Sequence, residues 1–361
     1  MASKHVNAIQ IEARGKATIK TVPLPKLRDN YLLIRTTAVA INPTDWKHIE
    51  FGTGPPGSKV GCDYAGVIEE VGPNVVKPFK KGDRVAGFAH GANQSQLEDG
   101  AFGEYNVVKE GLAIVIPKNL SDVEAATIGL GLATVGQGLY QSLQLPFPTE
   151  PIKETQYILI YGGATATGML GVQFAKLSGY TVVTTCSPDN FAYIKSLGAD
   201  AVFDYHDTEN CVTGIRAFTQ NRLRLAWDCV SSIETARICA QVLSSNEDSH
   251  YSSLLNVGSE ELTSINPRIH ARATVAYTAL GERFEKFGRV FEAKPEDYEF
   301  AQTFFEQARD LLEKGKVRPV RQTVNWYGQG LEGVLVGLQK HKEGLVRGAK
   351  LVYTLPQLPS S

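Results

Sequence analysis

The stretch YGGATATGMLG (residues 161–171) decides the fold. It follows an apolar run, YILI (157–160), and leads into the apolar-periodic segment MLGVQFAKLSGY (169–180), so it lies between a predicted strand and a predicted helix. Dinucleotide-binding turns at this place usually read G-x-G-x-x-G. Here Gly162 and Gly168 stand six positions apart with Thr165 between them, so a turn that is merely tight is the alternative interpretation.

The residues of the turn suit a pyrophosphate. Small side chains keep the backbone open to a phosphate, two threonine hydroxyls can donate to its oxygens, and the amino end of the following helix attracts negative charge. The sequence therefore predicts a phosphate-binding turn made by Gly162, Gly163, Ala164, Thr165, Ala166, Thr167 and Gly168.

Around this turn the chain alternates between strand and helix patterns. Apolar or β-branched runs at 157–161, 181–186, 201–205, 223–230, 251–257 and 273–278 predict six strands, and Gly179 and Gly198 end the first two helices. This rhythm predicts an α/β fold with a doubly wound parallel sheet over residues 151–284. Residues 1–150 and 285–361 carry short strands broken by Gly and Pro and predict one split, β-rich domain.

Bulk composition excludes several partner classes. A net charge of −1 and 21% charged residues give no reason to expect nucleic acid or an anionic membrane as partner. No run of about 18 apolar residues occurs, so no membrane span is predicted. The five scattered cysteines lack a C-x-x-C spacing, which predicts free thiols and a reducing, cytoplasmic location.

The end of the second strand predicts the nucleotide. NAD sites place a carboxylate about 20 residues after the glycines, where it binds a ribose hydroxyl and repels a 2′-phosphate. This chain has hydroxyls at the strand end instead, which favours NADPH over NADH. Asp189 is the exception, and we expect it to cap the next helix. The predicted contacts here are Ser187, Pro188, Asp189 and Asn190.

The whole chain resembles the zinc-free quinone oxidoreductase-like branch of the medium-chain dehydrogenase/reductase superfamily. The motifs that carry the resemblance stand in the expected order: AINPTDWK, GCDYAGVIEEVG, KGDRV, GAFGEYNVV, AATIGLGLATV, the glycine turn, SLGADAVFDY and GAKLVY. This resemblance implies a Rossmann NADPH-binding domain inserted into a split GroES-like catalytic and substrate domain.

A closer resemblance is to the fungal trans-acting enoyl reductases of polyketide pathways, through INPTDWK, GGATAT, TTCSPDNF and GADAVFDY. It implies hydride transfer from NADPH to the β-carbon of an α,β-unsaturated acyl thioester on a polyketide synthase carrier protein. A free-standing quinone or enone reductase is the first alternative. A weakly catalytic NADPH-binding protein, like the crystallin-type relatives, is an alternative of another class.

The resemblance also implies site residues. Lys47 orients the cofactor or stabilises an enolate, Thr134 lies beside the nicotinamide, and Tyr64 is a candidate proton donor, although a packed ring is equally compatible. Further expected cofactor contacts are Thr44, Asp45, Trp46, Lys47, Tyr205, Leu255, Asn256, Ala349 and Lys350. The expected walls of the acyl channel are Gly129, Leu130, Gly131, Leu132, Ala133, Thr134, Val135, Gly136, Thr278, Ala279, Leu280, Gly281 and Glu282.

The sequence also predicts that the chain binds no metal and forms no dimer through its sheet edge. Asn42 and Cys62 stand where zinc-dependent members have Cys and His ligands, and no cysteine-rich lobe is present, so no metal is expected. Without a Lewis acid, conjugate reduction is favoured over alcohol oxidation. Arg268, His270 and Arg272 alternate along a possible edge strand, which discourages strand pairing between chains and favours a monomer over a homodimer.

Overall fold

The computed structural model describes residues 5–286 and 288–356 and divides the chain into two compact units. Unit 1 joins residues 1–133 to 277–361, and unit 2 is the continuous segment 134–276. In the sequence, unit 2 thus stands between the two segments of unit 1. The contact boundaries follow residues 133 and 276, whereas the sequence placed them after residues 150 and 284.

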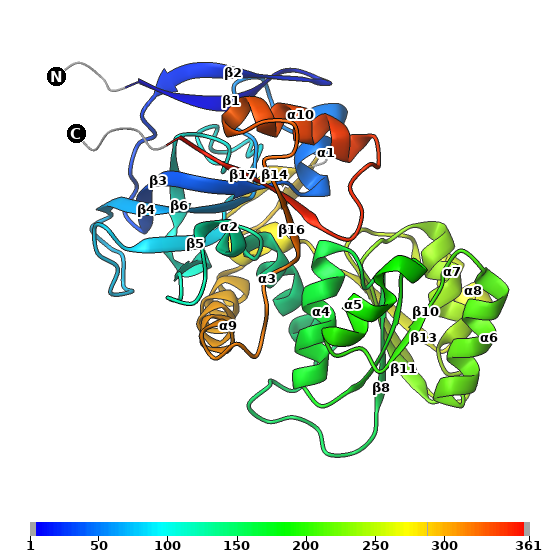
Figure 1. Cartoon of the computed structure of the whole chain (residues 1–361). Coiled ribbons are helices and arrows are strands. Elements are labelled where there is room, and N and C mark those ends of the chain that lie inside the picture. The colour runs from blue at the N-terminus through cyan, green and yellow to red at the C-terminus, as the bar shows by residue number, and fades with distance from the viewer. Residues whose placement is uncertain (1–4, 287, 357–361) are drawn as a thin grey trace. The chain divides into compact units, whose positions relative to one another are not determined.

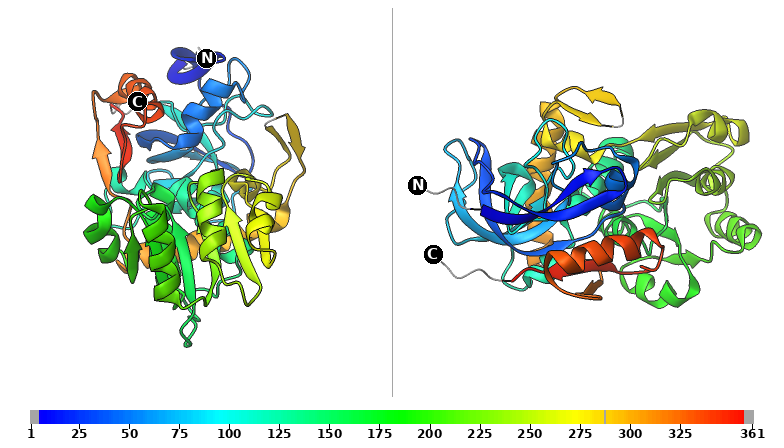
Figure 2. Two further views of the ribbon diagram at one scale, coloured as in Figure 1. Left: turned by 90° about the vertical axis from the view of Figure 1, so that its right-hand side faces the viewer. Right: turned by 90° about the horizontal axis from the view of Figure 1, so that it is seen from above.

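Unit 2 is built on a parallel six-stranded sheet in the order β10-β9-β8-β11-β12-β13. The order reverses direction at β8, which is the doubly wound arrangement and puts helices on both faces of the sheet (Figures 1 and 2). The strands are β8 (Tyr157–Tyr161), β9 (Thr181–Thr185), β10 (Ala201–Phe203), β11 (Leu223–Asp228), β12 (Ser249–Ser253) and β13 (Ile269–Ala273).

Glycines follow the carboxyl ends of two helices of unit 2. Gly179 and Gly198 follow the last turns of α4 and α5 with φ of 91° and 113°, the left-handed region that glycine adopts without strain. The helical segments are η2 (Gly136–Ser142), α4 (Ala166–Leu177), η3 (Pro188–Asn190), α5 (Phe191–Ser196), α6 (Thr208–Thr219), α7 (Ile233–Val242) and α8 (Ser259–Ile265).

One predicted strand is wrong. The sequence placed the sixth strand at residues 273–278, but β13 lies earlier, and residues 276–280 form the 3₁₀ helix η4 (Ala276–Leu280). β13 ends the sheet order and carries His270 and Arg272, because an edge strand has exposed positions that tolerate charge.

Unit 1 contains a seven-stranded, mostly antiparallel sheet in the order β16-β17-β3-β4-β5-β7, with β6 paired to β3, and two hairpins, β1–β2 and β14–β15. The strands are β1 (His5–Ala13), β2 (Lys16–Pro23), β3 (Tyr31–Ala40), β4 (Asp63–Val71), β5 (Arg84–Phe88), β6 (Tyr105–Lys109), β7 (Ala113–Val115), β14 (Phe284–Lys286), β15 (Arg289–Phe291), β16 (Gln322–Val324) and β17 (Lys350–Thr354).

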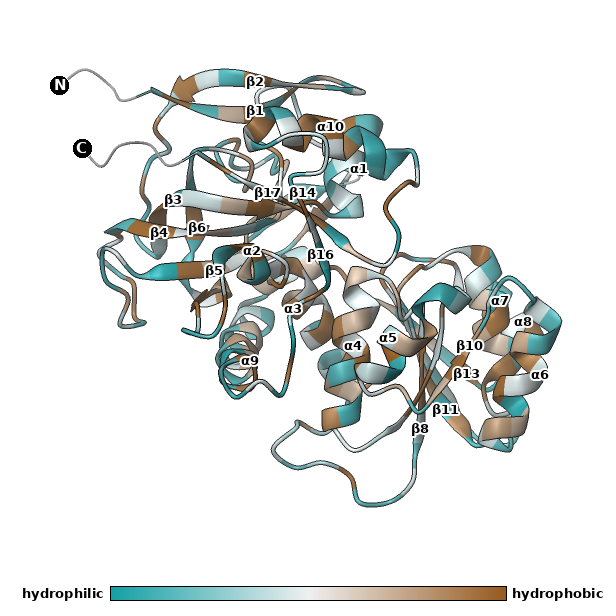
Figure 3. Cartoon of the chain, viewed as in Figure 1, coloured by the Kyte–Doolittle hydropathy of each residue, from teal (hydrophilic) through white to brown (hydrophobic). Residues whose placement is uncertain are grey.

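Helices cover this sheet with their apolar faces. Helix α9 buries Phe304, Phe305 and Leu312 and turns hydrophilic residues outward, as the teal colour in Figure 3 shows. The helical segments of unit 1 are α1 (Pro43–Phe51), η1 (Glu110–Leu112), α2 (Asp122–Ala125), α9 (Pro295–Glu313) and α10 (Gly330–Lys342), and α3 (Gly129–Val135) crosses the boundary between the units. No helix within the described ranges is apolar and long enough to span a bilayer.

Candidate active site

The glycine turn of unit 2 connects β8 to α4. Thr165 is the N-cap of α4, and its hydroxyl accepts a hydrogen bond from the Gly168 N–H at 2.9 Å. A Cβ on Gly168 would lie 2.2 Å from the Gly162 carbonyl oxygen, so only glycine lets the helix approach the strand this closely. Thr165 therefore has a structural role that sequence analysis did not assign to it.

The first turn of α4 leaves donors available. The N–H groups of Ala166 and Thr167 find no acceptor in the described part of the chain, and both residues are half-buried. Free N–H groups at a helix amino end, together with the helix dipole, make an anion site. These two N–H groups are the donors that an anion at this end of α4 would meet, and the pyrophosphate contact of the turn stays a prediction.

The end of β9 carries hydroxyls, as the sequence predicted. Ser187 Oγ and Tyr205 Oη lie 3.4 Å apart at the surface of unit 2. The expected cap by Asp189 is wrong, because Asp189 lies inside η3 and the N-cap of α5 is Asn190, whose side chain makes no cap bond. Leu255 and Asn256 follow β12 in an exposed loop.

The AINPTDWK motif of unit 1 forms the start of α1, with Asn42 as its N-cap. Asp45 is fully buried and its carboxylate accepts from the Asn42 N–H at 2.7 Å, which caps the helix. Burial raises the pKa of Asp45 to about 7, although the bond from Asn42 favours the ionised form. Asp45 therefore caps α1 within unit 1, and its contact with the cofactor stays a prediction.

Lys47 lies on the same helix and is half-buried. Its ammonium lies 5.7 Å from the centre of the Trp46 ring, and no carboxylate of the described ranges pairs with it. Burial lowers the pKa of Lys47. A cation without an internal partner is available for a ligand.

A buried polar cluster that the sequence analysis missed lies behind Thr44. Tyr277 Oη lies 2.9 Å from Thr44 Oγ1, 3.3 Å from His48 Nε2 and 3.6 Å from Cys62 Sγ, and His48 Nε2 lies 3.0 Å from Thr44 Oγ1. Burial and the Lys286 charge hold the pKa of His48 well below its usual range, so its imidazole is neutral at pH 7.

Lys286 completes this cluster. Its ammonium lies 4.0 Å from the centre of the Tyr277 ring and 3.4 Å from both His90 Nε2 and the Gly91 carbonyl oxygen. The side chain is fully buried, and none of the carboxylates described forms an ion pair with it. Burial lowers the pKa of Lys286 to about 8. We refer to Thr44, His48, Cys62, His90, Tyr277 and Lys286 as the Tyr277 cluster.

Tyr64, the candidate proton donor, is enclosed in the core of unit 1. Its ring is fully buried, its hydroxyl has no partner in the described chain, and burial raises its pKa far above 10. This geometry agrees with the alternative of a packed ring.

Lys350, a predicted cofactor contact, is also committed within unit 1. Its ammonium donates to Asp63 Oδ2 and to the Thr127 carbonyl oxygen at 3.1 Å, with only 3% of the residue exposed. Asp63 further accepts from the Asn42 amide at 2.9 Å and from the Leu130 N–H at 2.5 Å. Lys350 therefore joins β17 to β4, α1 and α3, and the predicted contact of Ala349 and Lys350 with the cofactor remains untested.

The predicted channel walls lie in two separate segments. Residues 129–136 form α3 and the start of η2, all buried except the half-buried Leu130. A Cβ on Gly129 would lie 2.0 Å from the Gly87 carbonyl oxygen, so this glycine is needed for close packing between the two segments. In the second segment Thr278 bonds to Asp297, and Glu282 binds Lys109 Nζ and Tyr31 Oη, both at 2.7 Å. Thr278 Oγ1 and Glu282 Oε1 are therefore engaged in bonds within unit 1.

The residues at the zinc-ligand positions do not suit zinc. Asn42 donates its amide to Asp63, Asp63 binds the Lys350 ammonium, and burial keeps the pKa of Cys62 well above its usual range. Zinc sites need deprotonated thiolates, neutral imidazoles or free carboxylates. Among the described residues, no group of three or more His, Cys, Asp or Glu is placed to hold a metal.

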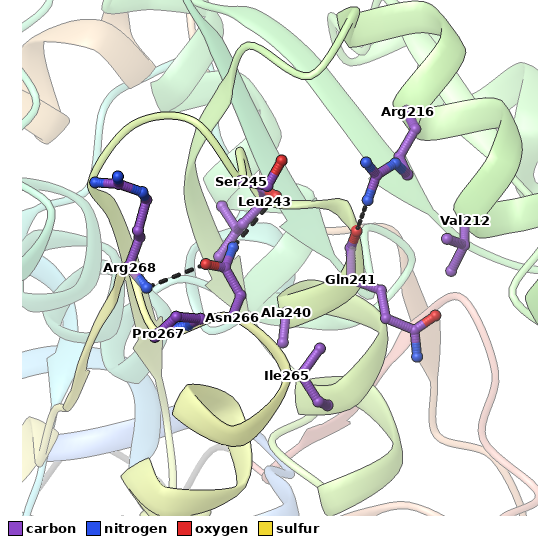
Figure 4. Close-up of a pocket in the computed structure, with 10 residues that line it drawn as sticks. All are labelled: Val212, Arg216, Ala240, Gln241, Leu243, Ser245, Ile265, Asn266, Pro267 and Arg268. Carbon is purple, nitrogen blue, oxygen red and sulfur yellow. Dashed lines mark hydrogen bonds between the residues drawn. The ribbon is translucent and has the colours of Figure 1, made fainter.

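A pocket of about 300 Å³ lies in unit 2, away from the turn (Figure 4). It is lined by residues that end α7 and precede β13, so it faces the amino ends of the strands, whereas nucleotides bind at the carboxyl ends. Arg216 donates to the Gln241 carbonyl at 2.8 Å and Asn266 to the Ser244 carbonyl at 3.0 Å. These internal bonds stabilise helix ends, and the pocket is not the predicted site.

The fold and the turn define a medium-chain dehydrogenase/reductase. Residues 28–118 match the family described as alcohol dehydrogenase GroES-like domain, and residues 166–293 match zinc-binding dehydrogenase. Solved structures share the fold: the CurK enoyl reductase (TM-score 0.76, 18% identity, 98% of this chain and 100% of that one) and the quinone oxidoreductase of Coxiella burnetii (0.70, 22%, 98% and 100%).

Closer relatives are curated fungal proteins. The trans-enoyl reductase resD of Aspergillus sclerotiorum is 46% identical over 96% of this chain and 99% of its own. The trans-enoyl reductase TOXD of Cochliobolus carbonum is 54% identical over 80% and 95%. The chain belongs to the trans-enoyl reductase family of the medium-chain dehydrogenase/reductase superfamily, which confirms the predicted resemblance and fold class.

Proposed function

We propose that the chain reduces the carbon–carbon double bond of an α,β-unsaturated acyl thioester carried by a polyketide synthase, with NADPH as the hydride source. The observation that carries this proposal is identity of 46% with a trans-enoyl reductase over nearly the whole length of both chains. The phosphate-binding turn and a donor set unsuited to zinc support it, because conjugate reduction needs a hydride donor and no Lewis acid.

Different residues of this chain would bind the cofactor and stabilise the charge that forms on the substrate. The turn at the amino end of α4 would hold the pyrophosphate, and the nicotinamide supplies hydride to the β-carbon when it is bound. Reduction leaves negative charge on the thioester oxygen, which needs a donor. Lys47, a half-buried cation without an internal carboxylate partner, is suited to that role.

A paired assay tests the proposal. Purified protein with NADPH is expected to turn over an enoyl pantetheine or carrier-bound thioester faster than a simple quinone, judged by kcat/KM. Quinone turnover without thioester turnover would instead support the free-standing quinone reductase, and turnover of neither substrate would support the weakly catalytic alternative.

We infer the preference for NADPH from the hydroxyls of Ser187, which follows β9, and Tyr205, which follows β10. Ser187→Asp is expected to raise the KM for NADPH about thirtyfold, because a new carboxylate near the 2′-phosphate costs roughly 2 kcal/mol at the surface. The KM for NADH should change less than threefold. Ser187→Asn, which adds bulk without charge, is the matched control, and an equal loss for both nucleotides would contradict the assigned position of the 2′-phosphate.

The two threonines of the turn are expected to respond differently. Thr167→Val should weaken NADPH binding about tenfold with little change in melting temperature, since its hydroxyl has no partner within the described chain and would bind only phosphate. Thr165→Val should in addition lower the free energy of unfolding by about 1 kcal/mol, because the α4 cap is lost. Calorimetry and thermal melts measure both. Loss of stability without loss of binding in Thr167→Val would show that the turn is only structural.

The carrier-bound substrate implies a separate synthase as partner. We also propose a cytoplasmic monomer, on the basis of five free, buried cysteines and the charged edge strand β13.

A further inference from the structure

We propose that Thr44 delivers the proton to the α-carbon of the substrate and that Tyr277, His48 and Lys286 act behind it as a buried proton relay. This inference rests on the proposed function, since it assigns the second half of the same reduction. It differs from the sequence analysis, which named Tyr64 as candidate donor.

Hydrogen bonds connect Thr44 to Tyr277 and to His48. Thr44 Oγ1 lies 2.9 Å from Tyr277 Oη and 3.0 Å from His48 Nε2, so a proton can pass from Tyr277 to Thr44 along one hydrogen bond. Thr44 is half-buried, whereas Tyr277 and His48 are 6% and 1% exposed. Thr44 is therefore the member through which the Tyr277 cluster reaches the surface of unit 1.

The buried ammonium of Lys286 lies beside Tyr277. A lysine removed from water without a carboxylate partner costs stability, so its retention needs a reason. Burial raises the pKa of Tyr277 well above its usual range, and the Lys286 ammonium, 4.0 Å from the centre of the ring, is placed to offset part of that cost when the phenol loses its proton. The titratable groups that also lie around this ammonium are His90, at 3.4 Å, and His48, Cys62 and Asp45; a carboxylate on Asp45 would favour the charged form of Lys286.

His48 contacts the hydroxyls of both Thr44 and Tyr277. Its Nδ1 has no partner in the described chain, so its only hydrogen bonds run through Nε2 to Thr44 and Tyr277. As a neutral imidazole with the proton on Nδ1, it accepts from either hydroxyl and keeps both at bonding distance. His48 is thus a positioning residue for the relay.

The reduction adds one hydride and one proton to the double bond. Hydride adds to the β-carbon and the electron pair of the double bond moves toward the carbonyl oxygen, forming an enolate. The α-carbon then takes the proton of Thr44 Oγ while Thr44 takes the proton of Tyr277 Oη, and the resulting phenolate faces the Lys286 ammonium. A proton from solvent restores Tyr277 through Thr44 before the next turnover.

The test follows solvent deuterium into the product. Wild-type protein in D₂O, with NADPH and an α-methyl enoyl pantetheine thioester, should place deuterium on one face of the α-carbon. Tyr277→Phe and Thr44→Val should lower kcat at least tenfold, with a smaller change in KM, and give both α-epimers, because water then protonates the enolate. Addition of hydride to the β-carbon should stay on one face. Lys286→Met should lower kcat but keep delivery to one α-face.

Controls separate the outcomes. Tyr353→Phe removes another buried hydroxyl of unit 1, which donates to the Trp326 carbonyl at 3.1 Å, and should leave kcat and the α-epimer ratio unchanged. If Tyr277→Phe still protonates one α-face and keeps kcat within twofold of wild type, the relay is overturned but the proposed function is not. The same conclusion follows if Tyr64→Phe gives both α-epimers and Tyr277→Phe gives only one. Absence of any thioester reduction by the wild-type chain overturns the proposed function and the relay together.

Discussion

Replacing Lys350 by methionine is expected to lower the free energy of unfolding by about 3–5 kcal/mol, because it leaves the buried carboxylate of Asp63 without its cation. The loss should be this large because Asp63 also holds the Asn42 amide and the Leu130 N–H, so three elements depend on one ionised group. Urea unfolding followed by tryptophan fluorescence measures it.

Two variants show whether the loss comes from the unpaired charge. Lys350→Met combined with Asp63→Asn should be less unstable than the sum of the single changes, because no charge is then buried alone. Lys342→Met removes an exposed partner of Glu50 in the same unit and should cost less than about 1 kcal/mol. A loss below about 1 kcal/mol in Lys350→Met would contradict the proposed role of the pair.

Replacing Lys286 by methionine is expected to stabilise the protein, whereas the same replacement at Lys350 destabilises it. Lys286→Met should raise the free energy of unfolding at pH 7 by about 3 kcal/mol, since the pKa of this lysine falls from an ordinary 10.5 to about 8 on burial. Methionine fills a similar volume without a charge to desolvate. The relay proposed above predicts that the more stable variant turns over more slowly.

The pH dependence identifies the cause of this gain. Between pH 8 and 10.5 the unfolded chain binds a proton at Lys286 that the folded chain does not, so the stability of the wild type rises with pH across this window. Below pH 8 both states are charged and the penalty is constant. The advantage of Lys286→Met over wild type should therefore be greatest below pH 8 and vanish near pH 10.5.

A second buried lysine provides the control. Burial also lowers the pKa of Lys59 to about 8, but its ammonium donates to Asn106 Oδ1 at 3.0 Å and to the Tyr105 carbonyl at 3.4 Å. Lys59→Met should gain less than Lys286→Met, because it leaves buried acceptors unsatisfied. A gain at Lys286 that stays constant from pH 7 to 10.5 would show that packing, not charge, explains it.

Local patterns were sufficient to predict most of the nucleotide-binding fold. The runs YILIY and TVVTT are buried parallel strands whose apolar, β-branched residues show in the sequence, and the glycines at 179 and 198 end helices through backbone conformation alone. The sixth strand was placed at residues 273–278 because the apolar run lies there. The alternating charges of residues 268–272 had indicated an edge strand, and β13 (Ile269–Ala273) is that strand, at the end of the sheet order.

The site was predicted less completely, for a physical reason. Tyr277 meets His48 across 229 positions and Lys286 meets His90 across 196, and no periodicity or short motif encodes such contacts. Thr165 was predicted as a phosphate ligand because its hydroxyl suits either role, and only the Gly168 bond identifies it as a helix cap. The contact of Lys350 with the cofactor was predicted from the family resemblance. The sequence did not show that Lys350 pairs with a buried carboxylate, that of Asp63.

The interrupted course of unit 1 affects how the protein is made. Asp63 leaves the ribosome 287 residues before Lys350, and the whole of unit 2 is synthesised in between. During that interval β3 and β4 can pair, but the Asp63 carboxylate lacks its cation and β17 has not yet joined the sheet. Completion of unit 1 is therefore expected to follow synthesis of the last strand, so a nascent chain stalled before residue 350 would expose an unfinished sheet edge to chaperones.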